Sequence, residues 1–172
     1  DQLGVMLDTS ALAAVGLQPE SDLLDLADRV PLDASPDLWQ LVAGTLDGID
    51  DMFKGQPQPQ AAFRKYALSR LSPKFEQLGW DSRAGDSSTV KDLRTSLIGT
   101  LSSMGDAKVI AEARRRFAAS ASDPAAMPPD LRCTVLGIVA YNADAATWDK
   151  LHAMARSEQS SMIRDQYYGL LA

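Results

Sequence analysis

Two segments of the chain repeat each other at a distance of 38 residues, and this repeat constrains the fold more than any other feature. Residues 92–101 align without gaps with residues 130–139, and both segments begin with Asp-Leu-Arg and carry Gly at the eighth position. Weaker copies occur at residues 37–46 and 163–171. A period of about 40 residues is typical of HEAT or armadillo solenoids, because one helix pair buries its apolar face only against neighbouring pairs.

Apolar side chains recur at helical spacing, and no stretch shows a sustained alternation of apolar and polar residues. Between residues 106 and 119, for example, Val109, Ile110, Ala113 and Phe117 mark one helical face. The sequence therefore predicts an all-α fold, an α-solenoid of HEAT- or armadillo-like helix pairs with about nine helices. The expected helices span residues 8–15, 21–30, 36–53, 60–78, 88–104, 107–119, 129–142, 145–157 and 160–172.

Single residues refine these helix boundaries. Ser35, Ser88, Asp106 and Asp144 are residue types that cap helix N-termini, so we expect each to cap the helix that begins at or after it. Pro73 lies inside the fourth expected helix and should kink or break it, because proline lacks the N–H that the helix needs. The glycine of each repeat lies in mid-helix and costs about 1 kcal/mol relative to alanine. We therefore expect two helices to approach closely at that glycine.

The composition argues against several classes of protein. The chain carries 17 Lys and Arg against 23 Asp and Glu, and a nucleic-acid partner is not expected because phosphate neutralisation needs clustered cations. One Cys and one His cannot build a disulfide framework or a four-ligand structural zinc site. No apolar stretch reaches the roughly 20 residues that span a bilayer, so no membrane partner is expected. With no leader visible, we expect a cytoplasmic protein, and a periplasmic or secreted one is the alternative.

Few residues suggest chemistry. Cys133 and His152 are the candidate nucleophile and base, but a lone Cys in an apolar helix is more often a small core residue. Asp22, Asp25 and Asp28 could bind a divalent cation, although an exposed acidic stripe is the simpler interpretation. The chain contains no His-Glu-x-x-His string, nucleophile elbow, Walker string or dinucleotide fingerprint. We therefore assign it no catalytic, cofactor-binding or metal-binding residue.

Arg94, Arg132 and Arg164 occupy the same place in three copies of the repeat, so stacked repeats would align them in a row. The simpler interpretation is that each arginine bonds an acidic residue or a helix end of the neighbouring repeat. The three arginines at 114–116 point in different directions from a helix and predict no convergent pocket. All three tryptophans are expected to anchor the core: Trp39, Trp80 and Trp148.

Several motifs occur in a distinctive order and spacing. They are Leu-Gly-Trp at 78–80, Gly-Asp at 85–86, Leu-Arg at 93–94, the segments 101–106 and 113–117, Pro-Asp-Leu-Arg at 129–132, and the segment 142–148. This order resembles the C-terminal helical domain of the gluzincin aminopeptidases, the large zinc enzymes related to puromycin-sensitive aminopeptidase and the endoplasmic-reticulum antigen-trimming aminopeptidases. The resemblance is strongest over residues 78–148. The sequence departs from the family at Asp86, where Glu is commoner, and in the Gln-Pro-rich loop at 56–60.

The resemblance implies that residues 1–172 are a single helical-repeat domain, a fragment of a larger C-terminal domain. In that family the zinc ligands and the general base lie in an upstream thermolysin-like domain, so no cofactor is expected in this chain. The helical domain encloses the active-site cavity, which makes the upstream catalytic domain and the peptide substrate its expected partners. If the arginine row faces that cavity, it would attract the C-terminal carboxylate of a peptide.

Two other functions remain open. The chain could be a stand-alone HEAT-like scaffold that binds another protein through its concave face. It could also be an independent enzyme that uses Cys133 or His152. A His-Glu-x-x-His motif in the upstream sequence would favour the aminopeptidase, whereas bound zinc and turnover by residues 1–172 alone would favour the independent enzyme.

Overall fold

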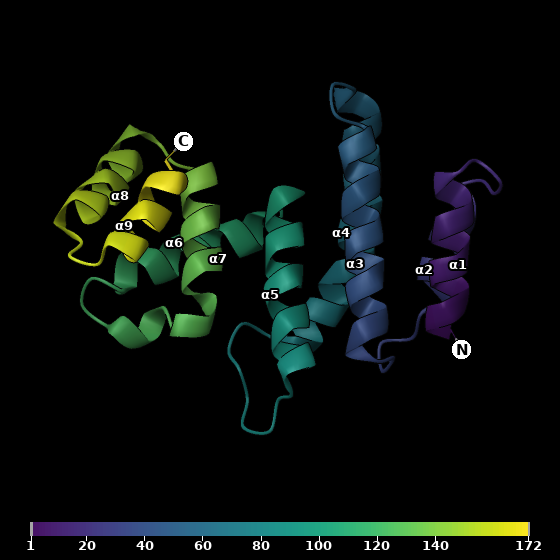
Figure 1. Cartoon of the computed structure of the whole chain (residues 1–172), viewed down its shortest axis with the longest axis horizontal. Helices are drawn as coiled ribbons and strands as arrows, with labels where there is room; N and C mark the ends of the chain where they lie inside the picture. Colours follow the sequence, from purple (N-terminus) through teal and green to yellow (C-terminus); the bar gives the residue numbers. More distant parts are fainter. Residues whose placement is uncertain (1, 172) are drawn as a thin grey trace. The chain divides into compact units, whose positions relative to one another are not determined.

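The computed structural model describes residues 2–171, and within that range it is entirely helical, as the periodicity predicts (Figure 1). Nine α-helices and one 3₁₀ helix account for the regular structure of this range. The helices are α1 (Gln2–Ala14), α2 (Ser21–Arg29), α3 (Pro36–Met52), α4 (Pro57–Leu78), α5 (Ser88–Ser103), α6 (Ala107–Ala119), η1 (Pro124–Ala126), α7 (Pro129–Tyr141), α8 (Ala145–Ser157) and α9 (Ser161–Gly169). The all-α prediction is therefore confirmed.

Most helix boundaries match the expected ranges, and the differences have local causes. The first helix begins at Gln2 rather than near residue 8, because the residues before Asp8 extend the same helix. α4 begins at Pro57, inside the Gln-Pro segment expected to be a loop, since proline is well suited to the first turn of a helix. Pro73 does not end α4, so the helix is not broken there, and the alternative outcome, a kink, stays a prediction. Its side chain is exposed.

Capping residues begin several helices where the sequence places them. Ser35 Oγ accepts a hydrogen bond from Leu38 N at 3.3 Å, and Asp144 Oδ1 accepts one from Thr147 N at 2.8 Å. Asp106 accepts from two backbone N–H groups of the first turn of α6. At α5 the cap is one residue earlier than predicted, because Ser87 rather than Ser88 accepts from Val90 N. These caps satisfy N–H groups that a helix cannot pair internally.

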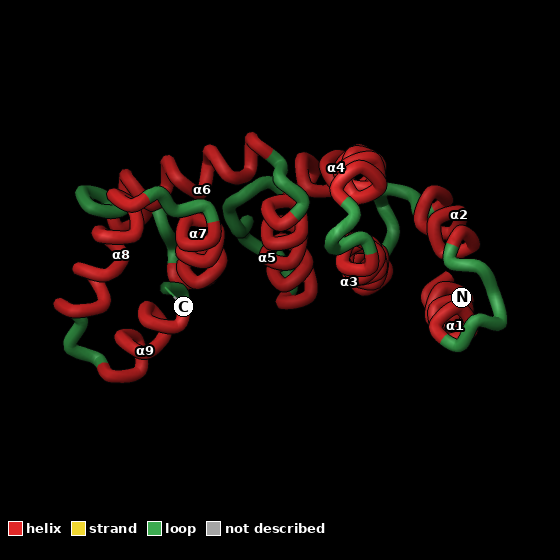
Figure 2. The backbone as a smooth tube through the Cα atoms, turned by 90° about the horizontal axis from the view of Figure 1, so that it is seen from above, coloured by secondary structure: helices red, strands yellow, loops and turns green. Residues whose placement is uncertain are grey.

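The chain divides into two compact units, Asp1–Met104 and Gly105–Ala172. In the first unit α1, α3 and α5 lie along one side, and α2 and α4 lie along the other (Figure 2). Contacts run from α1 to α3, from α3 to α5, from α2 to α1, and from α4 to both α3 and α5. Within this unit the helices therefore stack as pairs, which is the arrangement that the repeat predicts.

Trp39 lies in the core of the first unit. Its side chain is completely buried, and its indole Nε1 donates a hydrogen bond to the backbone carbonyl of Pro31 at 3.0 Å. The Arg70 guanidinium lies 4.8 Å from the centroid of the indole ring, and Lys74 Nζ lies 5.7 Å from it. Both distances are in the range of cation–π contacts. The expectation that Trp39 anchors the core is confirmed.

Arg70 and Lys74 also satisfy the end of α2. Arg70 Nε donates to the Ala27 carbonyl at 2.7 Å, its Nη2 donates to the Val30 carbonyl, and Lys74 Nζ donates to the Leu32 carbonyl at 2.7 Å. Cations are favourable at a helix C-terminus because they offset the negative end of the helix dipole. Burial of the Lys74 ammonium lowers its pKa.

An ion pair joins α3 to α4. Asp50 is buried, and its carboxylate accepts hydrogen bonds from Arg64 Nε and Nη2, both at 2.8 Å. Gln60 Nε2 donates to the same carboxylate at 3.1 Å. The hydrogen bond from Arg64 holds the pKa of Asp50 below its usual value.

In the second unit α6 packs against α7, α7 against α8, and α8 against α9. The buried apolar side chains include Val109, Val135 and Leu151. Trp148 does not join them, because 41% of its surface is exposed. Its ring stacks instead on His152, with the two centroids 4.9 Å apart. The prediction that Trp148 anchors the core is wrong, since the residue lies at the edge of the buried face of α8.

The mid-helix glycines do not mark close helix contacts. A Cβ atom added at Gly44, Gly99, Gly137 or Gly169 would meet no atom of the described chain within 4 Å. The expectation of close approach at these positions is therefore wrong for this chain.

Replacing Gly99 or Gly137 by alanine is expected to raise the free energy of unfolding by about 0.5–1 kcal/mol each. Alanine has the higher helix propensity, and the space for its methyl group is open. Urea unfolding followed by circular dichroism measures this change. The matched control is Gly105→Ala, which should destabilise by about 1 kcal/mol because Gly105 has a φ of 86°. A loss of stability at Gly99 and Gly137 as well would contradict the prediction.

Candidate functional site

Arg94, the first member of the predicted arginine row, is buried within the first unit. Only 1% of its surface is exposed. Its Nη2 donates to Asp86 Oδ2 at 2.6 Å, its Nε donates to the Gly79 carbonyl at 3.1 Å, and its Nη1 donates to Ser82 Oγ at 3.3 Å. Gly79 is the C-cap of α4, so Arg94 bonds both a helix end and an acidic residue. The simpler interpretation of this arginine is confirmed, and its side chain is not available to a substrate.

The same residues order the loop that joins α4 to α5. Asp86 Oδ2 also accepts a hydrogen bond from the backbone N–H of Arg83 at 2.8 Å. This backbone bond and the Arg94 guanidinium lower the pKa of Asp86. The Arg83 side chain donates to the Gln77 carbonyl at 3.1 Å, near the end of α4. We call Asp86, Arg94 and the Gly79 carbonyl the loop lock, because together they hold this loop against the start of α5.

Arg132 and Arg164 have a different environment from Arg94. Both side chains are exposed in the second unit. Arg132 lies in the first turn of α7, and the ion pairs of the described residues join Arg94 to Asp86 but join Arg132 to no carboxylate. The repeat therefore conserves residue type without conserving contacts, and only Arg132 and Arg164 remain available for a ligand.

Neither of the candidate catalytic residues lies in a reactive arrangement. Cys133 is exposed, so the expectation that it is a core residue is wrong. It follows Leu131 by two positions, which places it on the opposite side of α7 from that buried leucine. His152 lies between the rings of Trp148 and Tyr168, and its centroid is 6.2 Å from that of Tyr168. The hydrogen bonds of the described residues include none between Cys133 and His152.

The acidic stripe on α2 is partly used by α4. Asp28 Oδ1 accepts a hydrogen bond from the Tyr66 hydroxyl at 2.9 Å. Burial of the hydroxyl, followed by this hydrogen bond, raises the pKa of Tyr66 to about 12. Asp25 is exposed and Asp22 is half-buried. The stripe behaves as a solvated helix face that contributes one hydrogen bond between helices.

Each unit has one concave surface with a predominantly apolar lining, and these two are candidate binding sites. The larger is a groove of about 730 Å³ between α6, α7 and α8 of the second unit. Phe117, Val139 and Met154 contribute apolar surface to it, Arg114 and Lys150 contribute positive charge, and Asp144 contributes a carboxylate. Arg114 Nη2 donates to the Asn142 carbonyl at 2.8 Å, and both Arg114 and Lys150 are exposed.

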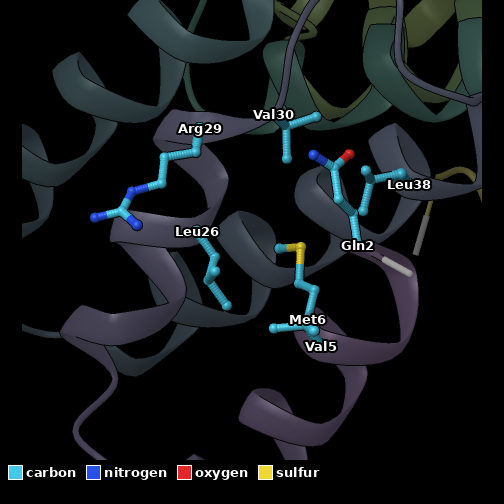
Figure 3. Close-up of a pocket in the computed structure, with 7 residues that line it drawn as sticks. All are labelled: Gln2, Val5, Met6, Leu26, Arg29, Val30 and Leu38. Carbon is cyan, nitrogen blue, oxygen red and sulfur yellow. The ribbon is translucent and has the colours of Figure 1, made fainter.

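The smaller surface is a pocket of about 250 Å³ in the first unit, between α1, α2 and the start of α3 (Figure 3). Its lining is mostly apolar and includes Val5, Met6, Leu26 and Val30. Sequence reasoning missed both surfaces, because each one forms only where three helices meet.

Comparison with known proteins assigns the chain to a family. Residues 1–172, the whole chain, match the family model described as "ERAP1-like C-terminal domain". The chain is an ERAP1-like C-terminal domain of the M1 aminopeptidases. This assignment confirms the resemblance that the motifs between residues 78 and 148 indicate.

Relatives of the ERAP1-like domain carry names of aminopeptidases. Aminopeptidase 2 of Candida albicans is 27% identical over 163 residues, which are 93% of this chain and 18% of that protein. Aminopeptidase M1-A of Oryza sativa is 30% identical over 77% of this chain and 15% of its own length. The human glutamyl aminopeptidase is 25% identical over 99% of this chain and 18% of its own length. The chain therefore spans less than a fifth of the length of these relatives.

The ERAP1-like domain does not supply a zinc site from its described residues. Residues 2–171 contain no group of three or more His, Cys, Asp and Glu side chains placed to hold a metal ion. The donor set does not fit zinc, because His152 and Cys133 are the only nitrogen and sulfur ligands of the usual types. Among the helices of the same range, none is long and apolar enough to cross a membrane.

Proposed function

We propose that this chain is the non-catalytic C-terminal part of a zinc aminopeptidase, where it encloses the active-site cavity and contacts the peptide substrate. The observation that carries the proposal is the family match over all 172 residues. The aminopeptidase names of relatives that are much longer than this chain support it. Zinc and the catalytic residues would lie in the upstream domain of the parent enzyme, which is the first partner of this chain.

The groove between α6, α7 and α8 is the surface of the second unit that best fits a peptide. Phe117 and Met154 offer apolar surface to side chains, and Lys150 offers an ammonium to a carboxylate. Arg114 adds a second positive charge, and its guanidinium donates a hydrogen bond to the Asn142 carbonyl. The residues of a peptide that lie far from the scissile bond would bind in this groove and add affinity without taking part in the reaction.

Lys150→Ala in the full-length parent enzyme is expected to lower kcat/KM for a long acidic peptide by about tenfold, the loss of one hydrogen bond to a charged group. Cleavage of a single-residue chromogenic substrate should not change, because that substrate does not reach the groove. The matched control is Lys65→Ala, an exposed lysine on α4 of the first unit.

Equal effects of Lys150→Ala on both substrates would show that this groove does not contact the peptide. A parent protein that binds no zinc and releases no N-terminal residue would contradict the whole proposal. The same assay applied to Arg132→Ala and Arg164→Ala tests the two exposed arginines of the repeat.

A further inference from the structure

The first helix of the chain is apolar over most of its surface. α1 has the sequence Gln-Leu-Gly-Val-Met-Leu-Asp-Thr-Ser-Ala-Leu-Ala-Ala, in which Asp8 is the single charged residue. Its buried face consists of Met6, Thr9 and Ala13. The opposite face carries Leu7, Ala11 and Ala14, all of them exposed. A helix that is apolar all round is normally covered on all sides by protein.

The exposed apolar side chains of the described residues are concentrated near α1. Five of the eleven large exposed apolar residues lie within 13 positions of one another: Val5, Leu7, Leu12, Val15 and Leu17. Their exposed fractions run from 37% to 73%. Single exposed apolar residues are ordinary, but a contiguous group marks a surface that another part of a protein covers. We call these five residues together with Ala11 and Ala14 the α1 outer face.

The pocket of the first unit lies beside this face. Val5 belongs to both, and Figure 3 shows the side chains of Val5, Met6 and Leu26 gathered in the pocket while the Arg29 guanidinium points away from them. A volume of about 250 Å³ is below the usual size of small-molecule sites, which is roughly 300–1,000 Å³. It is large enough for an apolar side chain, since a dry cavity of about 150 Å³ holds a benzene molecule.

The position of Gln2 suggests which polypeptide covers this surface. Gln2 lines the pocket, so the residues that precede it in a longer protein must pass close to the pocket. The chain matches 18% of the Candida albicans relative, and a C-terminal domain has most of the remaining polypeptide before it. A second copy of this chain is a poorer occupant, because each copy carries a net charge of −6 and the two would repel.

We propose that the segment of the parent polypeptide that precedes Gln2 packs on the α1 outer face and places an apolar side chain in the pocket between α1, α2 and α3. This inference rests on the proposed function, because both require a longer parent protein. The covering segment is itself mostly apolar on the side that faces α1, because Asp8 is the single charged side chain of α1. The contact therefore fixes the first unit to the preceding part of the enzyme by hydrophobic burial rather than by ion pairs.

Site-directed photocrosslinking in the full-length parent tests the identity of the covering segment. Benzoylphenylalanine placed at position 7 is expected to crosslink, within one molecule, to peptides that precede Gln2. The same probe at position 65, on the exposed side of α4, is the matched control and should give few such products. Crosslinks from position 7 to a second copy, or to residues after Ala14, would overturn the proposal.

Thiol labelling tests whether the face is covered at all. Leu7→Cys in the folded parent should react with a maleimide about tenfold more slowly than Lys65→Cys, and the two should react equally in urea. Equal rates in the folded protein would show that the face is bare and overturn the proposal. Both readouts are independent of peptidase activity. A protected α1 in a parent without activity would therefore contradict the proposed function and leave this inference intact.

Discussion

Trp39→Ala is expected to lower the free energy of unfolding of the chain by about 3–5 kcal/mol, the usual cost of deleting a buried tryptophan side chain. Trp39 is completely buried, and its removal leaves a cavity that the helices around it cannot fill. It also leaves the Pro31 carbonyl without the indole donor, and Arg70 and Lys74 without the ring beneath them. Domains of this size are stable by about 5–15 kcal/mol, so the loss is a large part of the total. Urea unfolding followed by far-ultraviolet circular dichroism measures it.

Two further variants separate the contributions at this position. Trp39→Phe keeps most of the apolar volume and removes the hydrogen bond to Pro31, so it should cost about 1–3 kcal/mol. Trp148→Ala is the matched control, because Trp148 is 41% exposed and should cost about 1 kcal/mol or less. A loss at Trp148 as large as that at Trp39 would contradict the burial difference between the two residues.

Arg94→Ala should destabilise the chain by about 1–3 kcal/mol, because it removes a buried guanidinium that makes three hydrogen bonds. The change leaves the Asp86 carboxylate without its guanidinium and takes a donor from the Gly79 carbonyl. The loop between α4 and α5 should also loosen, and faster amide hydrogen exchange at residues 80–87 measures this effect.

Arg132→Ala provides the matched control, because Arg132 holds the same place in the repeat but is exposed. It should change the free energy of unfolding by no more than about 0.5 kcal/mol. Arg94→Lys keeps the positive charge, but one ammonium cannot donate to Gly79, Ser82 and Asp86 together. Its free energy of unfolding should therefore lie between that of the original chain and that of Arg94→Ala. Equal effects of Arg94→Ala and Arg132→Ala would contradict a structural role for the loop lock.

The sequence predicts the helices well, because their signals are local. Ser35, Asp106 and Asp144 each cap a helix through a hydrogen bond to a residue two or three positions away. The spacing of apolar residues likewise reports which side of a helix is buried. The errors also have local explanations. Pro73 lies on an exposed side of α4, and the identity of the residue does not show whether its side of the helix is exposed.

The environments of repeated residues are less predictable. Arg94 and Arg132 share the motif Asp-Leu-Arg, yet one is buried by a folded-back loop and the other is exposed. Trp39 and Trp148 are the same residue type, but helices surround only the first on all sides. In each case the outcome depends on segments distant in sequence, and residue type cannot report what those segments do.

The helical periodicity and the capping residues of the sequence by themselves determined the all-α fold and most helix boundaries, and the order of its motifs indicated the likeness to aminopeptidase C-terminal domains. Only the tertiary structure decided that Arg94 is a structural residue, that the repeat glycines face open space, and that α1 keeps an uncovered apolar face. The physical reason is the separation along the chain over which each effect acts. Capping and periodicity act within a few residues, whereas burial is decided by helices that meet from distant parts of the chain.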